Sequence, residues 1–403
     1  MLDMVSSSTV LASGIAANGS ASNYVAVTSG TIPVSLEVTG SGAPSFTTNF
    51  VLTSADYSIV AFPTYLQGRP VVQAIALPEN QTAPAAGGGA QLRLYDLAPD
   101  AGHLDVYVQP TGQSMGASPL AANFSGTVNY YYPIAAGTYD VWVTGAGAPA
   151  DLRLKMSAVT ITDTEVATLA FTGTPGGVLV SGLVVAQPMG GNAVPVSAQL
   201  NSNARIRLAV SFTDNKSIAS GTVATATANQ TSVVGATPVQ SPAAESSYVL
   251  APAGSLLPIV LGGATCDTSK SATTTVANGS DSTLLVVGSS VSPVCYILND
   301  DNTLPAIGNA NLRLVNGIVS GVNSGGNLAL VYNSQQILSN VAFGTATEAS
   351  VPSGISSNLL VISAANGLYA PTSAVTLQQQ GVYSVFMLGD GTQASDFVLV
   401  RDH

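Results

Sequence analysis

The sequence predicts an all-β fold: a tandem array of four β-sandwich domains, the first of which lacks its N-terminal strand. A short apolar motif recurs along the chain, as Gln91–Tyr95, Arg205–Ala209 and Asn311–Val315. Short apolar runs bounded by Gly, Pro, Asn and Ser follow each motif, which is the pattern of strands in a sandwich. No segment shows a convincing helical period over roughly ten residues, so helices should be scarce.

The repeat sets the predicted domain boundaries, because each repeating unit must bury its own faces or share a core with its neighbour. The strand after the motif is Leu104–Val108 in the second copy and Leu328–Tyr332 in the fourth. The first copy begins at this later point, with Met1–Val5, and has no counterpart of the motif strand. The predicted domains are residues 1–84, 90–188, 203–299 and 307–403.

The second copy shows the order of strands most clearly. Its turn at residues 96–102 contains Pro99, which fixes φ, and Gly102, which relaxes it. Its predicted strands are residues 91–96, 103–109, 128–132, 138–143, 152–156, 165–172 and 178–186. In the first copy, Asn23–Val27 corresponds to the tyrosine-rich strand and Val34–Val38 to the strand that contains Trp142. Further strands are predicted at residues 56–62, 71–77, 247–250, 282–287, 294–298, 358–362, 382–388 and 397–400.

Composition and charge exclude several classes of partner. Only 8% of the residues are charged and the formal net charge is −11, so the chain lacks the basic surface that nucleic acid requires. No run of basic residues is present, which argues against binding to anionic lipid surfaces. No stretch approaches the roughly 18 consecutive apolar residues of a spanning helix, so no membrane span is expected.

The chain contains two cysteines, Cys266 and Cys295, both near β-type runs of the third copy. One interpretation is a pair of buried free thiols. The other, which we favour, is a disulfide, since no further cysteine competes for pairing. A disulfide would indicate an oxidising compartment.

Several short segments of the second copy resemble a bacterial family known as domain of unknown function 4397. The segments are Leu92–Leu94, Ala98–Gly102, Leu104–Val108, Gly137–Tyr139 and Glu165–Leu169. The first and fourth copies match more loosely, and the third lacks the Pro-Asp turn. The resemblance implies immunoglobulin-like sandwiches on exported bacterial proteins, often lipid-anchored and in tandem. It implies no catalytic residues, and a shared fold does not define function.

Candidate chemistry is sparse, and no catalytic residue or cofactor is predicted. The two histidines are His103, at the start of a strand, and the terminal His403. A catalytic triad needs a histidine beside an activated nucleophile, and no activated-serine motif is present. Asp300 and Asp301, with Asn299 and Asn302, could supply oxygen ligands for Ca²⁺, although a solvated linker is the preferred interpretation.

The aromatic run Tyr130, Tyr131 and Tyr132 is a candidate ligand face. Alternation along a strand sends Tyr130 and Tyr132 to one face and Tyr131 to the other. One of these faces must enter the core, so packing is favoured over stacking on a sugar. The sequence alternative to a structural role is therefore an extracellular module that binds a glycan or another ligand.

The sequence favours a non-enzymatic structural protein that is extracellular or displayed on the cell surface, fibre-forming or adhesive. No signal peptide is visible at Met1. Two hypotheses address the missing first strand. Either the strand and an export signal lie upstream of Met1, which we favour, or a neighbouring molecule supplies the strand to the open edge of the first copy. The second hypothesis predicts self-association through that edge, because an unfilled edge is an aggregation hazard.

Overall fold

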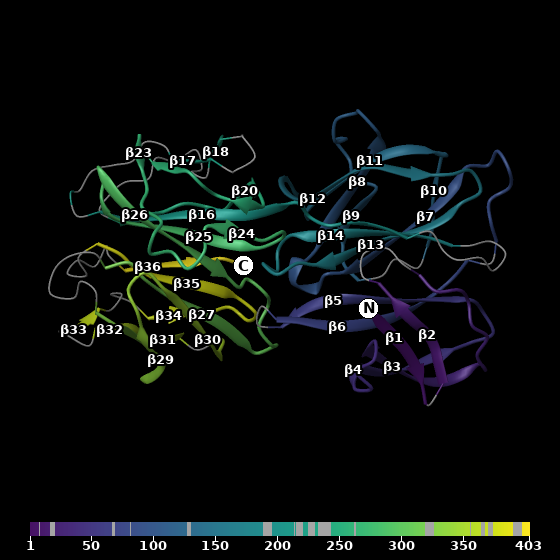
Figure 1. The fold of residues 1–403 in the computed structure, drawn as a ribbon, viewed down its shortest axis with the longest axis horizontal. Helices are drawn as coiled ribbons and strands as arrows, with labels where there is room; N and C mark the ends of the chain where they lie inside the picture. Colours follow the sequence, from purple (N-terminus) through teal and green to yellow (C-terminus); the bar gives the residue numbers. More distant parts are fainter. Residues whose placement is uncertain are drawn as a thin grey trace. The chain divides into compact units, whose positions relative to one another are not determined.

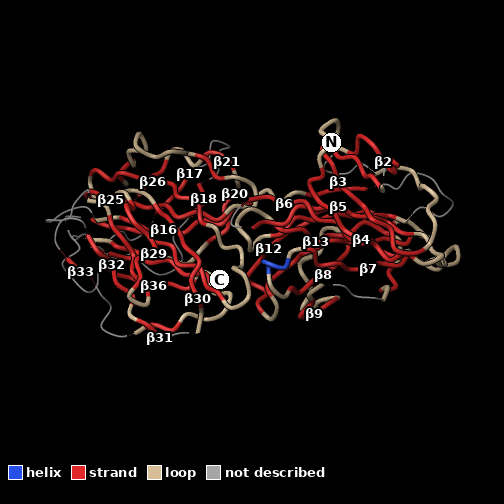
Figure 2. The backbone as a smooth tube through the Cα atoms, turned by 90° about the horizontal axis from the view of Figure 1, so that it is seen from below, coloured by secondary structure: helices blue, strands red, loops and turns tan. Residues whose placement is uncertain are grey.

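The protein is almost entirely β-structure and divides into two compact units. The computed structural model describes residues 1–7, 9–16, 21–66, 69–80, 82–126, 130–187, 196–212, 214, 221–224, 230–232, 243–261, 263–318, 326–354, 356–363, 367–369, 374–389 and 397–403. Unit 1 consists of Met1–Thr174 and Leu179–Asn201, and unit 2 of Pro175–Val178 and Ser202–His403. Strands dominate both units (Figure 2), and the helix found in the described part is the 3-10 turn Pro99–Ala101. The all-β prediction is confirmed.

Unit 1 begins with repeat 1, which we define as β1–β6. Four of its strands form a sheet in the order β2–β1–β3–β4, and β5 and β6 form a separate hairpin. Alternate apolar side chains such as Val34 and Leu36 fill its core. The strands are β1 (Leu2–Ser6), β2 (Thr9–Ile15), β3 (Gly30–Val38), β4 (Pro44–Leu52), β5 (Tyr57–Leu66) and β6 (Arg69–Pro78).

Repeat 2, defined as β7–β15, completes unit 1 as a two-sheet sandwich. The sheets have the orders β10–β7–β13–β14–β15 and β12–β11–β8–β9. Pro99 opens the 3-10 turn after β7, and Gly102 ends it at a φ of 65°, which is the turn chemistry predicted from the sequence. The strands are β7 (Ala90–Leu97), β8 (Leu104–Pro110), β9 (Ala121–Phe124), β10 (Tyr132–Ile134), β11 (Gly137–Gly145), β12 (Ala148–Ile161), β13 (Val166–Gly173), β14 (Val180–Ala186) and β15 (Val196–Gln199).

Repeat 3, defined as β16–β26, opens unit 2. One sheet has the order β19–β16–β25–β26, with β20 also pairing β16, and the other has the order β18–β17–β22–β23. The strands are β16 (Asn203–Phe212), β17 (Gly221–Ala224), β18 (Gln230–Ser232), β19 (Ala243–Glu245), β20 (Val249–Pro252), β21 (Gly254–Ser255), β22 (Ile259–Leu261), β23 (Ala264–Thr265), β24 (Thr275–Val276), β25 (Asp281–Ser289) and β26 (Ser292–Asp300).

Repeat 4, defined as β27–β36, has the sheet orders β30–β27–β35–β36 and β29–β28–β32–β33. The strands are β27 (Asn309–Asn316), β28 (Leu328–Tyr332), β29 (Gln335–Val341), β30 (Ala346–Pro352), β31 (Ser356–Ser357), β32 (Leu359–Ser363), β33 (Gly367–Tyr369), β34 (Val375–Thr376), β35 (Val382–Met387) and β36 (Phe397–Arg401). The four predicted domain boundaries stay predictions, because the structure separates the chain into two units.

The recurring motif forms a central strand that pairs in parallel with a strand late in the same repeat. These pairs are β7 with β13, β16 with β25, and β27 with β35. In repeat 1 the corresponding late strand is β5, and among the described residues it pairs only with β6. Among the described residues, repeat 1 therefore shows no motif strand beside β5, in line with the sequence prediction.

The predicted strand at Asn23–Val27 is wrong, because residues 21–28 form no strand. In repeat 2 the matching strand β10 pairs with β7. The described residues of repeat 1 include no counterpart of β7, so residues 21–28 have no such strand with which to form hydrogen bonds. Sequence patterns also missed β2, β4 and β9, whose residues are mostly polar or small.

Within each unit the two repeats pack face to face: in unit 1 the β5–β6 hairpin packs on the motif-strand sheet of repeat 2, and in unit 2 the two motif-strand sheets pack on each other. In unit 1, side chains of β5 and β6 such as Phe62 and Leu77 meet Tyr95 and Leu97 of β7. In unit 2, one apolar cluster joins the two sheets, and Figure 1 shows the sheet of β16, β25 and β26 stacked against that of β27, β35 and β36. The outer face of a motif strand is therefore buried between repeats.

Candidate functional site: arginine clusters and the open edge of β5

An arginine lies at the centre of each motif strand: Arg93 on β7, Arg207 on β16 and Arg313 on β27. The residues on either side of each arginine are leucine or isoleucine and point into the sandwich core. Because side chains alternate along a strand, the arginine points to the opposite face. That face is the one packed against the neighbouring repeat, and each arginine is at most 4% exposed.

Each arginine meets a hydroxyl group on the parallel strand. Arg93 pairs in register with Thr168, Arg207 with Thr283, and Arg313 with Ser384. The guanidinium donates to that hydroxyl in all three repeats, for example from Arg207 Nε to Thr283 Oγ1 at 2.8 Å. The arginine and the hydroxyl are thus a fixed pair across the central strands.

In unit 2 the two arginines share two buried carboxylates. Arg207 forms ion pairs with Asp300 and Asp402, and Arg313 forms ion pairs with the same two residues at 3.2 Å and 3.3 Å. All four side chains are at most 2% exposed. The Tyr248 hydroxyl donates to Asp300 Oδ2 at 2.6 Å, and the Tyr248 ring lies 4.6 Å from the Arg207 guanidinium. We call these five residues the unit 2 arginine cluster.

The charges of this cluster are set by opposing effects. Burial alone would raise the pKa of Asp300, but Arg313 and Arg207 outweigh it, so the pKa of that carboxyl lies below its ordinary value. Two guanidinium groups facing two carboxylates give no net charge inside the interface. Such a cluster fixes how two sheets meet, because one unpaired member would be costly.

In unit 1 the equivalent arginine has neutral partners. Arg93 donates to Thr168 and to the carbonyl of Pro78 at 2.6 Å. Gln187 occupies the place of the cluster aspartates, and its amide donates to the Tyr131 hydroxyl at 3.1 Å. The Tyr131 ring lies 5.0 Å from the Arg93 guanidinium.

The predicted ligand face consists of Tyr130, Tyr131 and Tyr132, and the structure places these side chains in two different surroundings. Tyr131 lies over the Arg93 guanidinium and is half-buried. Tyr130 is 54% exposed, and its ring centroid lies 4.5 Å from that of Tyr132. Both rings line a shallow depression beside β9, and ligand binding there stays a prediction.

The two candidate calcium ligands bind different protein groups. Asp300 belongs to the unit 2 arginine cluster. Asp301 Oδ1 accepts hydrogen bonds from the backbone and the hydroxyl of Thr303, at 2.9 Å and 2.6 Å. Among the described residues, no group of three or more His, Cys, Asp or Glu side chains could hold a metal ion. His103 of repeat 2 immediately precedes β8, and its side chain is exposed.

Glu348 of β30 lies beside the unit 2 arginine cluster. It lies 3.6 Å from Arg313 Nε. Burial raises the pKa of Glu348 to about 7, with Arg313 opposing this and Asp301 adding to it. Burial likewise raises the pKa of Asp281 to about 6, against the effect of Arg205. These carboxyl groups are more easily protonated in the folded protein than in the unfolded chain.

A Glu348→Gln variant should flatten the pH dependence of stability. A raised folded-state pKa contributes stability that is fully present below the unfolded value of 4.5 and is lost as the pH rises through about 7. We expect the fall in Tm between pH 5 and pH 8 to shrink by about 3 °C in the variant. Thermal unfolding followed by circular dichroism measures this. Glu37→Gln on β3 is the matched control, and an identical slope in wild type and Glu348→Gln would contradict the assignment.

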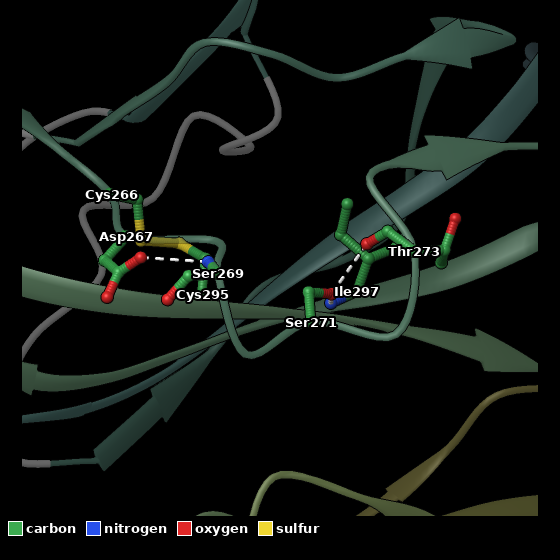
Figure 3. Close-up of a disulfide and its surroundings, with 7 residues drawn as sticks. All are labelled: Cys266, Asp267, Ser269, Ser271, Thr273, Cys295 and Ile297. Atoms are coloured by element: carbon green, nitrogen blue, oxygen red, sulfur yellow. Dashed lines mark hydrogen bonds between the residues drawn. A yellow bond between two sulfur atoms is a disulfide. The ribbon is translucent and has the colours of Figure 1, made fainter.

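The structure joins Cys266 and Cys295 in a disulfide, as favoured from the sequence. Cys295 lies on β26, Cys266 follows β23, and their Cα atoms are 5.8 Å apart. The bond therefore links the two sheets of repeat 3. Within the intervening loop Ser269 N donates to Asp267 Oδ1 at 2.9 Å (Figure 3), and Ile297 N of β26 donates to Ser271 Oγ of the loop at 2.9 Å. Both cysteines are buried.

Sequence reasoning found the tyrosines and the cysteines but missed the arginine cluster. The signal was present: the same arginine stands between two aliphatic residues in three copies of the motif. Its alternation with leucine resembles that of an ordinary solvent-facing residue. Only the packing of one repeat on another shows that this face is buried.

The fold defines a protein of packed β-sandwich repeats with buried arginines between them. Within the described residues, no helix has the length and apolar character needed to cross a bilayer. Residues 2–107 match the family model described as domain of unknown function (DUF4397), so this stretch of the chain is similar to that family. The match runs from β1 to β8. These two strands occupy equivalent positions in repeat 1 and repeat 2. It includes the motif residues 92–107 but not those at 137–139 or 165–169.

Other comparisons add little. A search of curated proteins found no match. Among solved structures, the chain is similar to the Bacillus anthracis TIE protein, at 8% sequence identity and a TM-score of 0.14. The match covers 96% of this chain and 65% of that protein, so this chain spans less than two thirds of its length. A likeness this distant defines neither fold nor function.

Proposed function

We propose that the protein is a non-enzymatic structural protein of the bacterial cell surface or extracellular space, which forms fibres or adhesive assemblies by strand addition. The observation that carries this proposal is the edge of β5. Its counterparts β13, β25 and β35 each have a parallel partner, and β5 has none among the described residues. An unpaired edge presents a row of backbone donors and acceptors that can pair with another chain.

Two further observations support export. The Cys266–Cys295 disulfide is a bond that persists in oxidising compartments. The DUF4397 resemblance implies exported bacterial proteins that carry such domains in tandem. The low content of charged residues and the many buried apolar clusters suit a structural role rather than a catalytic one. No residue role in this proposal requires a catalytic group.

Electron microscopy and size-exclusion chromatography of the purified protein test the proposal. We expect ordered assemblies or concentration-dependent oligomers. Ala61 on β5 is exposed, and Ala61→Asp should abolish assembly because it places a charge where an added strand would pack. Ala150→Asp, at an exposed position of β12, is the matched control. A protein that stays monomeric at all concentrations would contradict a fibre-forming role.

A further inference from the structure

Repeat 1 contains the side chains that surround the arginine in the other repeats. On the hairpin of β5 and β6, Ser58 pairs with Leu77, and Glu79 lies two residues beyond. Repeat 3 has the same spacing: Thr283 pairs across to β26, and Asp300 lies two residues beyond its partner. Ser58 therefore takes the place of Thr283, and Glu79 that of Asp300.

The contacts among these side chains are also the same. Ser58 Oγ donates to Glu79 Oε1 and the Tyr24 hydroxyl donates to Glu79 Oε2, each at 2.5 Å. In repeat 3, Thr283 and Tyr248 each donate to Asp300 at 2.6 Å. Burial raises the pKa of Tyr24, and the hydrogen bond to Glu79 raises it further, so the phenol remains a donor.

The absent member of this set is the arginine. In every other repeat an arginine stands in register with the hydroxyl residue on the parallel strand. Within the described part of the chain, no ion pair joins Glu79 to a lysine or an arginine. A half-buried carboxylate with two hydroxyl donors thus lacks the cation that its counterpart Asp300 has.

The apolar surroundings of β5 are open in the same place. Ile59 is half-buried and Ala61 is exposed, whereas their counterparts Leu169 and Phe171 on β13 are at most 1% exposed. In repeat 2, Leu94 of the motif strand packs with those residues in the core. Val25 and Val27, beside Tyr24, are 49% and 41% exposed. Both sides of the position of the missing strand therefore leave apolar surface uncovered.

We propose that the edge of β5 accepts a parallel strand from another polypeptide molecule, and that this strand is recognised by an arginine between two aliphatic residues. The guanidinium binds Glu79 and Ser58 and lies on the Tyr24 ring. The two aliphatic side chains cover Ile59 and close the core of repeat 1. This inference rests on the proposed strand addition and names the chemistry that selects the strand.

A synthetic peptide with the sequence of residues 89–98, which forms β7, serves as the probe. Titration calorimetry with the 403-residue protein compares this peptide with a version that carries Arg93→Gln. A hydrogen bond to a charged group contributes enough that we expect the arginine peptide to bind about ten- to a hundredfold more tightly. Hydrogen exchange at the amides of β5 should slow when the arginine peptide is bound. Equal binding of both peptides, or no protection of β5, would overturn the proposal.

Protein variants locate the contact. Glu79→Gln should remove the difference between the two peptides, since the carboxylate is the partner of the guanidinium. Ser58→Ala should reduce it, and circular dichroism checks that both variants fold. Glu37→Gln on β3 is the control and should leave the difference unchanged. If Glu79→Gln and Ser58→Ala both keep the full difference, the arginine does not bind at this site.

The direction of the strand is a separate readout. A spin label on the N-terminus of the peptide should broaden signals near Tyr57 at the start of β5 in a parallel complex, and signals near Tyr65 in an antiparallel one. Broadening near Tyr65 would overturn the parallel assignment.

The proposed strand addition and the proposed arginine site can be contradicted by different results. If the protein binds the arginine peptide but stays monomeric, fibre formation is contradicted. If the Glu79→Gln variant assembles as the wild type does, the arginine site is contradicted.

Discussion

Replacing Arg207 with methionine should destabilise unit 2 by about 3–5 kcal/mol, because it leaves the carboxylates of the unit 2 arginine cluster without half of their positive charge. Asp300 and Asp402 are fully buried, so water cannot solvate them. The remaining charged members have fixed places, since Asp300 ends β26, Asp402 directly follows β36 and Arg313 lies on the central strand β27. Amide hydrogen exchange of β16 and β27 under increasing urea measures the loss within this unit.

Two further variants separate charge from packing. Arg401→Gln, at an exposed position of β36 in the same unit, should change stability by no more than about 0.5 kcal/mol. Adding Asp402→Leu to Arg207→Met removes one carboxylate together with one guanidinium, and we expect it to recover most of the loss. A double variant as unstable as Arg207→Met alone would show that the arginine acts through shape rather than charge.

Removing the disulfide should lower the stability of repeat 3 by roughly 3–4 kcal/mol in the chain-entropy model. The cysteines are 29 residues apart, so the bond closes a loop long enough to restrict the unfolded chain. The bond also fixes the segment after β23 against β26, which otherwise depends on backbone hydrogen bonds such as the one from Cys295 N to the Asp267 carbonyl. Chemical unfolding of a Cys266→Ala, Cys295→Ala double variant measures the effect.

Reduction provides the matched control for that variant. Dithiothreitol should lower the stability of the wild type to about that of the double variant and leave the double variant unchanged. If reduction has no effect on the wild type while the double variant is destabilised, the loss comes from the buried volume of the two thiols. Equal stability of all samples would mean that the bond contributes nothing.

The sequence was sufficient to predict the β-fold, because alternating apolar residues and turn residues are local signals. It also predicted that β5 would have no motif strand beside it in the described part of repeat 1, since the repeat itself supplies the comparison. Strands without a clear alternation, such as β4, were missed. The segment at Asn23–Val27 has the right residues for a strand, yet it forms none because its partner is absent. Strand formation there depends on a neighbour, which no local pattern reveals.

The arginine clusters depend on contacts between distant parts of the chain. Arg207 meets Asp402, which lies 195 residues away. Neither residue is unusual in its own segment, and their meeting depends on how two sheets pack. Tyr131 is a second example of a contact that local sequence patterns do not reveal. Strand alternation correctly separates it from Tyr130 and Tyr132, but the partner that covers it, Arg93, comes from a different strand.

The burial of arginine faces between repeats has a consequence for how such chains gain and lose length. A single repeat cut from its partner would expose an apolar face. In unit 2 it would also separate Arg207 from its ion-pair partner Asp402 in the other repeat. A duplication or deletion of both repeats of a unit keeps the face between them covered. Lineages that lengthen or shorten this array should therefore change it two repeats at a time.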